Sequence, residues 1–410
     1  MSASVLGHLT LGYQWVWNSR REVAAVQLFV QSDAQAPVDA SHLLALIAQT
    51  WAGRSPRLIL SVQSTPLLAD LLRHAPADGP WLALQAKQLE HPLIAAQLLQ
   101  TGTVAAPLLW RGAPGERPPP ALQAGLLRSM VSLSAGEALL ALHEARRLAN
   151  RADSAPNARR NNPILPDQIV ESVGSGLLAA HCLDQCGAWG VAGWPVEDVI
   201  FARRQQPVGA SQGDILRLLK AVEADAAMDR IEALLAREPL LCYRFLRHAN
   251  SAELGLRNPV ESLRHGLMIL GLSKFTQWLL EQLAHASTDV DLQPVRTMVT
   301  VRTQLMEQLL DAGDEDTLRR EVTLCGLLSQ IDLLSGEPLK QALQRIALPE
   351  RVLSALLGNS GPYAPYLHIA TALEHPATHK LPELCAAHGI DIGDVNRTLL
   401  RVLSQARTDT

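Results

Sequence analysis

Short apolar runs alternate with helix-like segments through the first half of the chain. The apolar runs predict strands at residues 23–31, 57–63, 80–90 and 103–110. Between them, N-capping residues, a proline in the first turn or a terminal glycine predict helices at residues 41–53, 64–75 and 91–102. Strands separated by helices in this way predict βαβ units with a parallel sheet. We therefore expect an α/β domain over residues 1–200.

The pattern changes after the fourth predicted strand. Residues 111–121 form a Pro/Gly loop, and the polar segment 150–166 is too rich in Pro and Asn for a helix. Residues 122–149 between them are predicted to be helical, with a break near Ser134–Gly136. Residues 201–213 mix charge, Gly and Pro without apolar periodicity, so we predict an inter-domain linker there.

Helical periodicity dominates from residue 214 onward. An amphipathic helix is predicted across 214–238 from the stripe of Ile215, Leu218, Leu219, Val222, Ile231, Leu234 and Leu235. Further helices are predicted at 239–250, 259–269, 272–286, 292–312, 316–334, 337–346, 349–357 and 364–373, and two more on either side of Gly389. No β-like alternation interrupts them. The fold class is thus α/β plus all-α, with an all-helical domain at 214–410.

Composition excludes several classes of protein. The 410 residues are 48% hydrophobic and 19% charged, so the chain can bury a core and is not disordered as a whole. Lys and Arg exceed Asp and Glu by one in residues 1–206, and acids exceed bases by five in residues 207–410. Neither half is basic enough for a dedicated phosphate-backbone binder. We expect no nucleic-acid partner.

Cysteine usage and hydropathy predict a cytoplasmic protein. Five scattered cysteines fit a reducing compartment better than a disulfide scaffold. No run of about 18 apolar residues and no signal-peptide pattern is present, so no membrane insertion is expected. Cys182 and Cys186 in "HCLDQC" share one face of a predicted helix. We interpret them as two small buried thiols, and a structural metal site is the alternative.

Residues 237–278 resemble the HDOD domain, an HD-related output domain of bacterial signalling proteins. The resemblance rests on Glu238-Pro239, the Asn250-Ser251 pair, Gly255, the "ESLRHGLMILG" segment and Gly271. Asn250-Ser251 can end one helix, Gly255 can permit a tight connection, and Pro259 can start the next helix. The stretches "VTLCGLLSQIDLLSG" and "LPERVLSALLG" extend the similarity, which covers most of residues 208–375.

In the family this domain is found behind an EAL-like domain, a phosphodiesterase-like TIM-type barrel. Here "CGAWGVAGWPVED" (186–198) is similar to the last strand of an EAL domain, and residues 11–31 resemble its opening hairpin. A full eight-fold barrel takes about 250 residues, more than this half offers. The resemblance implies a degenerate EAL-type TIM-like barrel at 1–200 that is trimmed or distorted.

The resemblance also implies where metal-binding carboxylates of an EAL phosphodiesterase would lie. Those positions carry Gln27, Ser61, Gln85 and Leu108-Leu109, Trp189 falls near the family's Gln, and the later Lys and Glu find no match in "NNPILPDQIVES". Amides are poor substitutes for carboxylates in a two-metal site, and leucine supplies no ligand. We expect that two-metal hydrolysis is lost.

The HD-type metal site is expected to be lost as well. Ser329 and Gln330 stand where a catalytic HD hydrolase has adjacent His and Asp, and Asp332 has no nearby His. Asp332 is predicted to be a solvated or capping residue. We therefore predict that the chain is not an enzyme, and we assign it no catalytic, cofactor-binding or metal-binding residue and no cofactor.

A basic segment and a tryptophan pair are the remaining candidates for contacts. A partner-binding basic patch is predicted from Arg244, Arg247, His248, Arg257, Arg264 and His265. Ordinary solvated helix faces interleaved with acids are the alternative. Trp15 and Trp17 share one face of a predicted strand, where core packing is favoured over an exposed dimer surface.

These expectations define one leading function and two others. We predict a bacterial signal-transduction protein that acts through contact with other signalling or regulatory proteins. The alternative is a non-cleaving cyclic-di-GMP receptor in which the degenerate barrel binds the nucleotide. Residual phosphohydrolase chemistry in the helical domain is a third, less favoured option, and a homodimer is left open.

Overall fold

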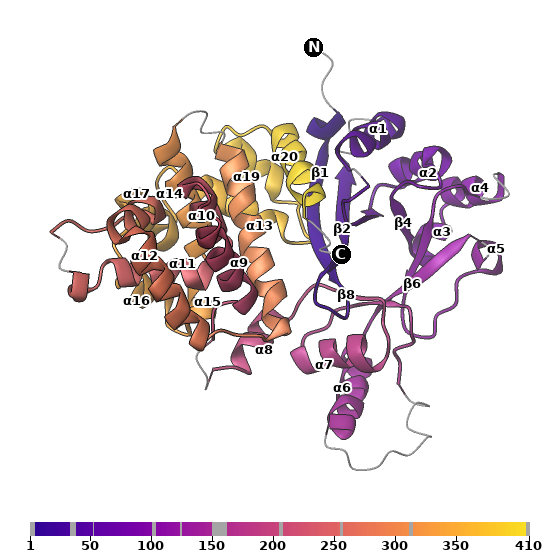
Figure 1. Ribbon diagram of the computed structural model, residues 1–410. Helices are drawn as coiled ribbons and strands as arrows, with labels where there is room; N and C mark the ends of the chain where they lie inside the picture. The colour runs from indigo at the N-terminus through magenta and orange to yellow at the C-terminus, as the bar shows by residue number, and fades with distance from the viewer. Residues whose placement is uncertain are drawn as a thin grey trace. The chain divides into compact units, whose positions relative to one another are not determined.

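The computed structural model describes residues 5–32, 38–51, 53–100, 104–123, 125–149, 162–204, 208–254, 257–310 and 315–406 (Figure 1). The chain forms two compact units. The first comprises Met1–Asp198 and Ala372–Thr410, and the second comprises Val199–Thr371. Among the described residues, no helix combines the length and apolar character needed to cross a membrane.

The first unit contains a closed barrel in which the strands follow one another in chain order. Its strands are β1 (Leu9–Trp17), β2 (Val23–Ser32), β3 (Arg57–Val62), β4 (Trp81–Leu84), β5 (Leu108–Gly112), β6 (Leu126–Ser132), β7 (Ile169–Glu171) and β8 (Gly190–Ala192). β1 is antiparallel to both β2 and β8, and the pairs from β2 to β8 are parallel. The expected parallel sheet is confirmed, but the barrel is closed rather than incomplete.

Helices connect the strands on the outside of the barrel. They are α1 (Ala40–Thr50), α2 (Thr65–His74), α3 (Ala86–Leu89), α4 (Pro92–Gln100), α5 (Pro120–Gln123), α6 (Ala135–Ala149), α7 (Gly176–Ala180) and α8 (Val196–Phe201), with a 3₁₀ turn η1 (Val5–His8) and a π-helical turn η3 (His181–Gln185). Helices α1 and α2 lie within one to three residues of their predicted ranges, and Pro66 lies in the first turn of α2 as expected, but α1 is capped by Asp39, which precedes the predicted start.

The helical prediction for residues 122–149 is wrong in its first part. Leu126–Ser132 forms strand β6, which is paired in parallel with β5 and β7, and only α6 after Ser134 is a long helix. Its "LLRSMVS" sequence lacks clean alternation, and long-range pairing decided its conformation over local propensity. The predicted break near Ser134–Gly136 marks the junction between the two, where Ser134 and Glu137 form a reciprocal cap.

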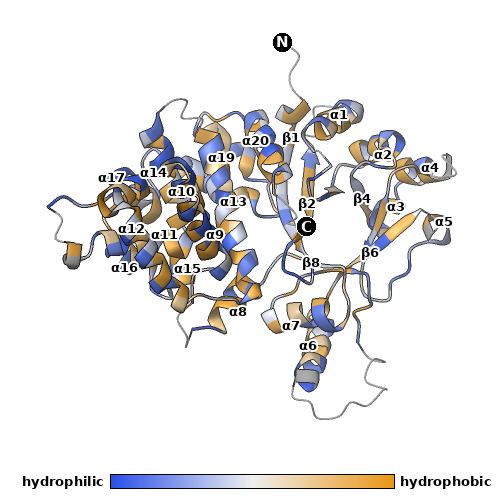
Figure 2. Cartoon of the chain, in the orientation of Figure 1, coloured by the Kyte–Doolittle hydropathy of each residue, from blue (hydrophilic) through white to orange (hydrophobic). Residues whose placement is uncertain are grey.

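The second unit is all-helical. Its helices are α9 (Gln212–Glu223), α10 (Met228–Leu235), α11 (Pro239–Ala249), α12 (Leu263–Ala284), α13 (Gln293–Leu310), α14 (Asp316–Leu328), α15 (Ile331–Ser335), α16 (Leu339–Leu343), α17 (Glu350–Gly358) and α18 (Ala364–Leu373), with 3₁₀ turns η4 (Ala252–Leu254) and η5 (Val290–Leu292). Figure 2 shows apolar and polar residues side by side along these helices, as amphipathic periodicity predicts.

Several helix boundaries differ from the predicted ones. The helix expected across 214–238 is divided into α9 and α10, and Asp225 in the break has a positive φ of 50°. The separation expected between the helices at 259–269 and 272–286 is confirmed: both belong to α12, and Gly271, which has a non-helical φ of 73°, divides them. α12 begins after the capping residue Ser262 rather than at Pro259. Gly255 lies outside the described residues.

A buried ion pair fixes the start of α11. The side chain of Glu238 is fully buried, accepts a hydrogen bond from Leu241 N and pairs with Arg296 at 2.9 Å. Asn250 ends the same helix, as predicted, and its side-chain amide and Val260 exchange hydrogen bonds of 2.7 and 2.9 Å. These contacts give the Glu238-Pro239 and Asn250-Ser251 pairs a structural role.

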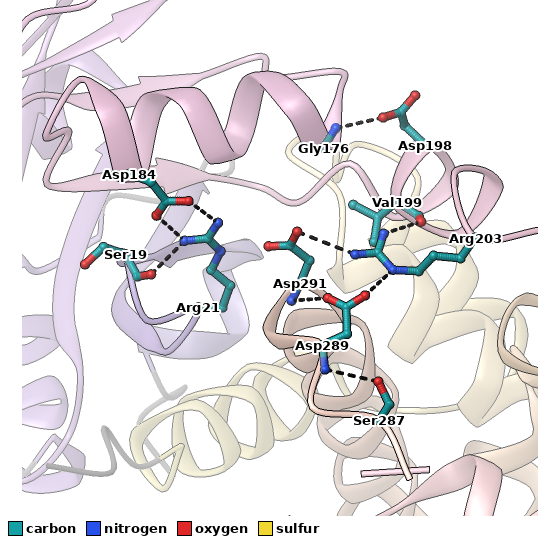
Figure 3. A network of polar contacts seen from close by, with 10 residues as sticks. All are labelled: Ser19, Arg21, Gly176, Asp184, Asp198, Val199, Arg203, Ser287, Asp289 and Asp291. Atoms are coloured by element: carbon teal, nitrogen blue, oxygen red, sulfur yellow. Dashed lines mark hydrogen bonds and ion pairs between the residues drawn. The ribbon is translucent and has the colours of Figure 1, made fainter. Parts of the chain in front are cut away.

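The segment predicted as linker is held by specific contacts where it is described. Arg203 binds Asp289 and also contacts Asp291 at 3.5 Å and the Val199 carbonyl oxygen at 2.6 Å (Figure 3). Further along, Ser211 forms a parallel β-bridge with Ser287. Residues 205–207 of the predicted linker lie outside the described residues. In the first unit, Figure 3 also shows Arg21 of the β1–β2 turn bound to Asp184 of η3 at 2.6 and 2.7 Å.

The predicted all-helical domain at 214–410 extends too far at its C-terminal end. Residues 372–410 group with the barrel, including α19 (Leu381–Ala387) and α20 (Ile392–Ser404). Figure 1 shows α20, in yellow, beside β1, in indigo. The buried Asn396 side chain of α20 donates to the carbonyl oxygens of Leu6 and Leu9 at 2.9 and 2.7 Å.

Close backbone approach explains one glycine of β1. A Cβ atom at Gly12 would lie 2.4 Å from the carbonyl oxygen of His375 and 2.4 Å from Thr378 Cγ2. Only glycine allows the loop after α18 to pack on the strand at this distance. The segment containing His375 and His379 is a loop. Trp15 and Trp17 are buried, which confirms their predicted core packing.

Candidate functional site

The inward-facing residues of the barrel form two layers. The lower layer is apolar and consists of Val16, Ala25, Ile59, Trp81, Ala83, Leu109, Met130, Ile169 and Ala192, with Trp189 packed against it. Successive inward positions on a strand are two residues apart. Two residues further along β2, β3, β5, β6 and β7 lie Gln27, Ser61, Arg111, Ser132 and Glu171. This polar layer faces the carboxyl ends of the parallel strands, where sites of such barrels are built.

Glu171 is the centre of a hydrogen-bonded network in the polar layer. Its carboxylate accepts hydrogen bonds from Arg111 Nε at 2.7 Å and Ser132 Oγ at 2.6 Å, and from Gln27 Nε2 at 3.4 Å. Gln27 also donates to Ser61 Oγ at 2.8 Å. Glu171 is only 4% exposed, so its charge depends on Arg111 for compensation.

The structure brings some of the residues at the expected site positions together and places others elsewhere. Gln27 and Ser61 lie in the polar layer, and Gln85 follows β4 at the same end of the barrel. Leu109 instead belongs to the apolar layer, and Arg111 occupies the site position of β5.

Sequence reasoning overlooked Glu171. This acid ends the three-residue strand β7, within the segment where no match to the family's acids was found. The available signal was the pattern of an apolar residue, a spacer and a polar residue at the end of several predicted strands.

The residues of the polar layer do not fit a two-metal centre. Such a centre holds two cations with several carboxylates, but this layer offers one carboxylate, an amide, two hydroxyls and a guanidinium. The guanidinium of Arg111 places a fixed positive charge beside the only acid of the network. Within the described residues, no group of three or more His, Cys, Asp or Glu side chains is arranged to hold a metal.

A cavity of about 490 Å³ opens beside this network. Its lining comes from the ends of β2 to β5 and the segments that follow them, and it comprises Phe29, Ser61, Val62, Gln63, Thr65, Ala83, Gln85, Lys87, Gln88, His91 and Arg111. Ser61 and Arg111 thus belong both to the network and to the cavity wall. The volume lies in the range of ordinary small-molecule sites.

The helical unit places a cation beside the residues that stand at the HD position. Arg302 of α13 is 5% exposed, and its Nη1 donates to Ser329 Oγ at 3.3 Å. Ser329 Oγ donates in turn to the Gly326 carbonyl oxygen at 2.7 Å. Ser329 and Gln330 form the break between α14 and α15, so the helix predicted across 316–334 is divided there. A hydroxyl bound to a guanidinium is a poor metal ligand.

The predicted basic patch contains residues in different environments. Arg244 donates to the Val208 carbonyl oxygen at 2.8 Å, and its burial lowers its pKa. Arg264 pairs with Asp229 and lies 3.7 Å from Glu232. The other four members remain at or near the surface: His248 stacks on Trp278 and is half-buried, and Arg247, Arg257 and His265 are exposed.

The "HCLDQC" segment forms the π-helical turn η3 and the residue after it. Cys182 is fully buried, and burial raises the pKa of its thiol. Asn162 contacts His181 Nε2 at 3.0 Å and donates to Cys186 Sγ at 3.1 Å, and Gln185 contacts His181 Nδ1 at 2.6 Å. Amide side chains therefore occupy both ring nitrogens of His181, which favours a packing role for the segment.

Comparison with known proteins identifies the helical unit. Residues 212–343 match the family model described as "HDOD domain", so this part of the chain is an HDOD domain. The barrel is not identified by that match. The predicted HDOD part is confirmed over this range, within the second unit of the structure.

Two individual proteins show partial similarity. Cyclic di-GMP phosphodiesterase CdgJ of Vibrio cholerae is 23% identical over 171 residues, which are 42% of this chain and 40% of that protein. The match thus spans about two fifths of the relative's length. The crystal structure of the MmoQ response regulator of Methylococcus capsulatus is 17% identical, with a TM-score of 0.37, and covers 49% of this chain and 99% of that one.

Proposed function

We propose that this chain is a bacterial signal-transduction protein that acts through contact with other proteins and does not hydrolyse cyclic-di-GMP. The observation that carries the proposal is the Arg111–Glu171 ion pair in the polar layer of the barrel. The similarity to a protein named as a cyclic-di-GMP phosphodiesterase supports a place in that signalling context. We also propose that the barrel is a degenerate EAL-type barrel, supported by its antiparallel opening hairpin followed by parallel strands.

Electrostatics opposes metal-assisted hydrolysis at this site. Two divalent cations that activate water need several negative ligands to balance their charge. Here the carboxylate of Glu171 is already neutralised by Arg111, and the guanidinium would repel an incoming cation. The same reasoning applies to the HDOD domain, where Arg302 binds the hydroxyl of Ser329. Among the described residues of both units, no cluster of metal-binding side chains supports such chemistry.

A hydrolysis assay tests the absence of activity. The full chain is incubated with cyclic-di-GMP and Mg²⁺ or Mn²⁺, and the linear product is separated by chromatography. We expect cyclic-di-GMP to be hydrolysed no faster than in the same metal-containing buffer without protein. Hydrolysis that EDTA stops and that Glu171→Gln abolishes would show that the barrel is catalytic, and the proposal would be wrong.

The alternative of a cyclic-di-GMP receptor is separated by calorimetry. Titration of the full chain with cyclic-di-GMP without metal is expected to give no saturable heat, because the positions that hold the ligand in the resembled family are substituted. Saturable binding without turnover would favour the receptor. The surface for protein partners is tested independently of this result.

We propose that the first half of α12 contacts the protein partner. His265, Met268 and Ile269 lie at the spacing of one helix face, and Met268 and Ile269 are 64% and 43% exposed. An apolar stripe next to a basic side chain fits a partner segment that combines apolar and acidic residues.

Site-specific photocrosslinking tests the α12 surface. A photoreactive residue at Met268 is expected to capture a partner that one at the exposed Gln277 does not, and Ile269→Glu is expected to weaken the capture. Equal capture from both positions would contradict the assignment.

A second copy of the chain is the proposed partner of α6. Gly136, Leu139, Leu140 and His143 are exposed at helical spacing, and the two leucines are 66% and 61% exposed. In an antiparallel pair this stripe is self-complementary, with Leu139 beside Leu140 of the second copy and Gly136 opposite His143. Light scattering is expected to give a dimer that Leu139→Ser with Leu140→Ser converts to a monomer. A wild-type monomer would refute this pairing.

A further inference from the structure

The described residues that line the cavity beside the barrel network include basic side chains. Lys87 contributes a permanent positive charge, and Arg111 contributes a guanidinium whose charge is shared with Glu171. No Asp or Glu is among the described residues that line the cavity. Glu171 lies behind the wall, in contact with Arg111 Nε. The cavity itself therefore favours a negatively charged occupant.

Several hydrogen-bond donors at the cavity wall have no acceptor in the described protein. Arg111 uses Nε for Glu171, and its Nη1 and Nη2 donate to none of the described residues. Ser61 is 8% exposed and accepts a hydrogen bond from Gln27, but no described residue accepts the proton of its own hydroxyl. A buried hydroxyl with an unused proton is destabilising unless water or a ligand accepts it.

The rest of the lining defines the ligand further. Phe29, Val62 and Ala83 are buried apolar residues of the strands that line the cavity. Thr65 and Gln63 add a hydroxyl and an amide on other segments. Donors thus come from β3, β5 and the segments that follow the strands, and donors on separate elements can bind different oxygens of a phosphate group. The apolar residues leave room for a small organic part.

We propose that this cavity binds the phosphate group of a small phosphate monoester. The two Nη donors of Arg111 and the ammonium of Lys87 bind the phosphate oxygens, and Ser61 donates a hydrogen bond to them. No metal ion takes part, in contrast to the two-metal chemistry of the resembled barrel class. The ligand is an input to the proposed signalling function, but its binding does not depend on which protein partner the chain contacts.

Calorimetry with a defined monoester tests the proposal. The full chain is titrated with glycerol 3-phosphate at constant ionic strength, and with glycerol, inorganic phosphate and cyclic-di-GMP in parallel. We expect saturable binding of glycerol 3-phosphate and of inorganic phosphate, and none of glycerol. Lys87→Gln is expected to weaken binding of glycerol 3-phosphate by about tenfold, as for the loss of one charge-assisted hydrogen bond.

A matched control separates this site from general charge effects. Lys380→Gln removes an exposed lysine that belongs to the same unit but lies far from Lys87 in the sequence. This change is expected to leave the affinity for glycerol 3-phosphate unchanged. Both lysines are exposed, so neither change should unfold the barrel.

Three results would overturn the proposal. They are no saturable binding of any phosphate, equal weakening by Lys87→Gln and Lys380→Gln, and binding of cyclic-di-GMP alone. The last would instead favour the receptor. Hydrolysis of cyclic-di-GMP would refute the proposed function. It would not decide whether the cavity binds phosphate, which depends on the measured affinities for glycerol 3-phosphate.

Discussion

Removing the side chain of Asn396 should loosen the attachment of α20 to the barrel. Its amide donates to the carbonyl oxygens of Leu6 and Leu9 at 2.9 and 2.7 Å, and Asn396 is 0% exposed. Asn396→Ala removes both donors. A buried acceptor left without a partner lowers the free energy of unfolding by about 1–3 kcal/mol. The variant leaves two such carbonyl oxygens, one of which can regain part of its hydrogen bonding, so we expect a total loss of about 2–4 kcal/mol.

The expected change is large enough to measure. For a unit of this size, 1 kcal/mol shifts the midpoint of thermal unfolding by about 2–4 °C, so Asn396→Ala should lower it by about 4–16 °C. Hydrogen exchange should show faster exchange in α20 and in β1. Arg397→Ala is the matched control, because Arg397 is exposed on the same helix and pairs only with its neighbour Asp394. Equal midpoints for the two variants would refute the reasoning.

Two further predictions concern the HDOD unit. Gly326→Ala should lower the stability of this unit by about 1–3 kcal/mol, because the new Cβ would lie 2.6 Å from Thr303 Cα. Gly213→Ala is the control, because a Cβ has space there. Chemical denaturation compares the two variants, and equal stabilities would contradict the close helix contact. Burial raises the pKa of Glu307, which binds Thr323, so its charged form disfavours folding as pH rises through that pKa. Glu307→Gln should therefore raise the melting temperature at pH 8 but not at pH 3, and a constant difference would argue against this origin.

The sequence predicted best what depends on local periodicity. Helices such as α9 and α11 follow from local signals, and the motifs that carry the HDOD resemblance lie in or beside α11 and α12, within the matched residues 212–343. Strands β7 and β8 have three residues each, too few for a periodic signal, and β6 owes its conformation to pairing with neighbours distant in sequence.

The candidate site was predictable only where it depends on local sequence patterns. Gln27 and Ser61 could be placed because they lie near the ends of recognisable strands. The pairing of Arg111 with Glu171 depends on β5 and β7, which are far apart in sequence and lie on either side of β6 in the sheet. Asn396 gave a weaker hint, as a buried polar residue among the apolar positions of α20, but its partners lie almost a full chain length away.

The return of the chain to its first unit has a mechanical consequence. The described chain runs from residue 5 to residue 406, and both of these segments belong to the barrel unit. A stretching force applied to residues 5 and 406 acts directly on the contact of α20 with η1 and β1, to which the hydrogen bonds of Asn396 belong. Tension reaches the HDOD unit only after α20 has detached. The contact between α20 and the N-terminal segment of the barrel unit therefore has to rupture before force can unfold the HDOD unit.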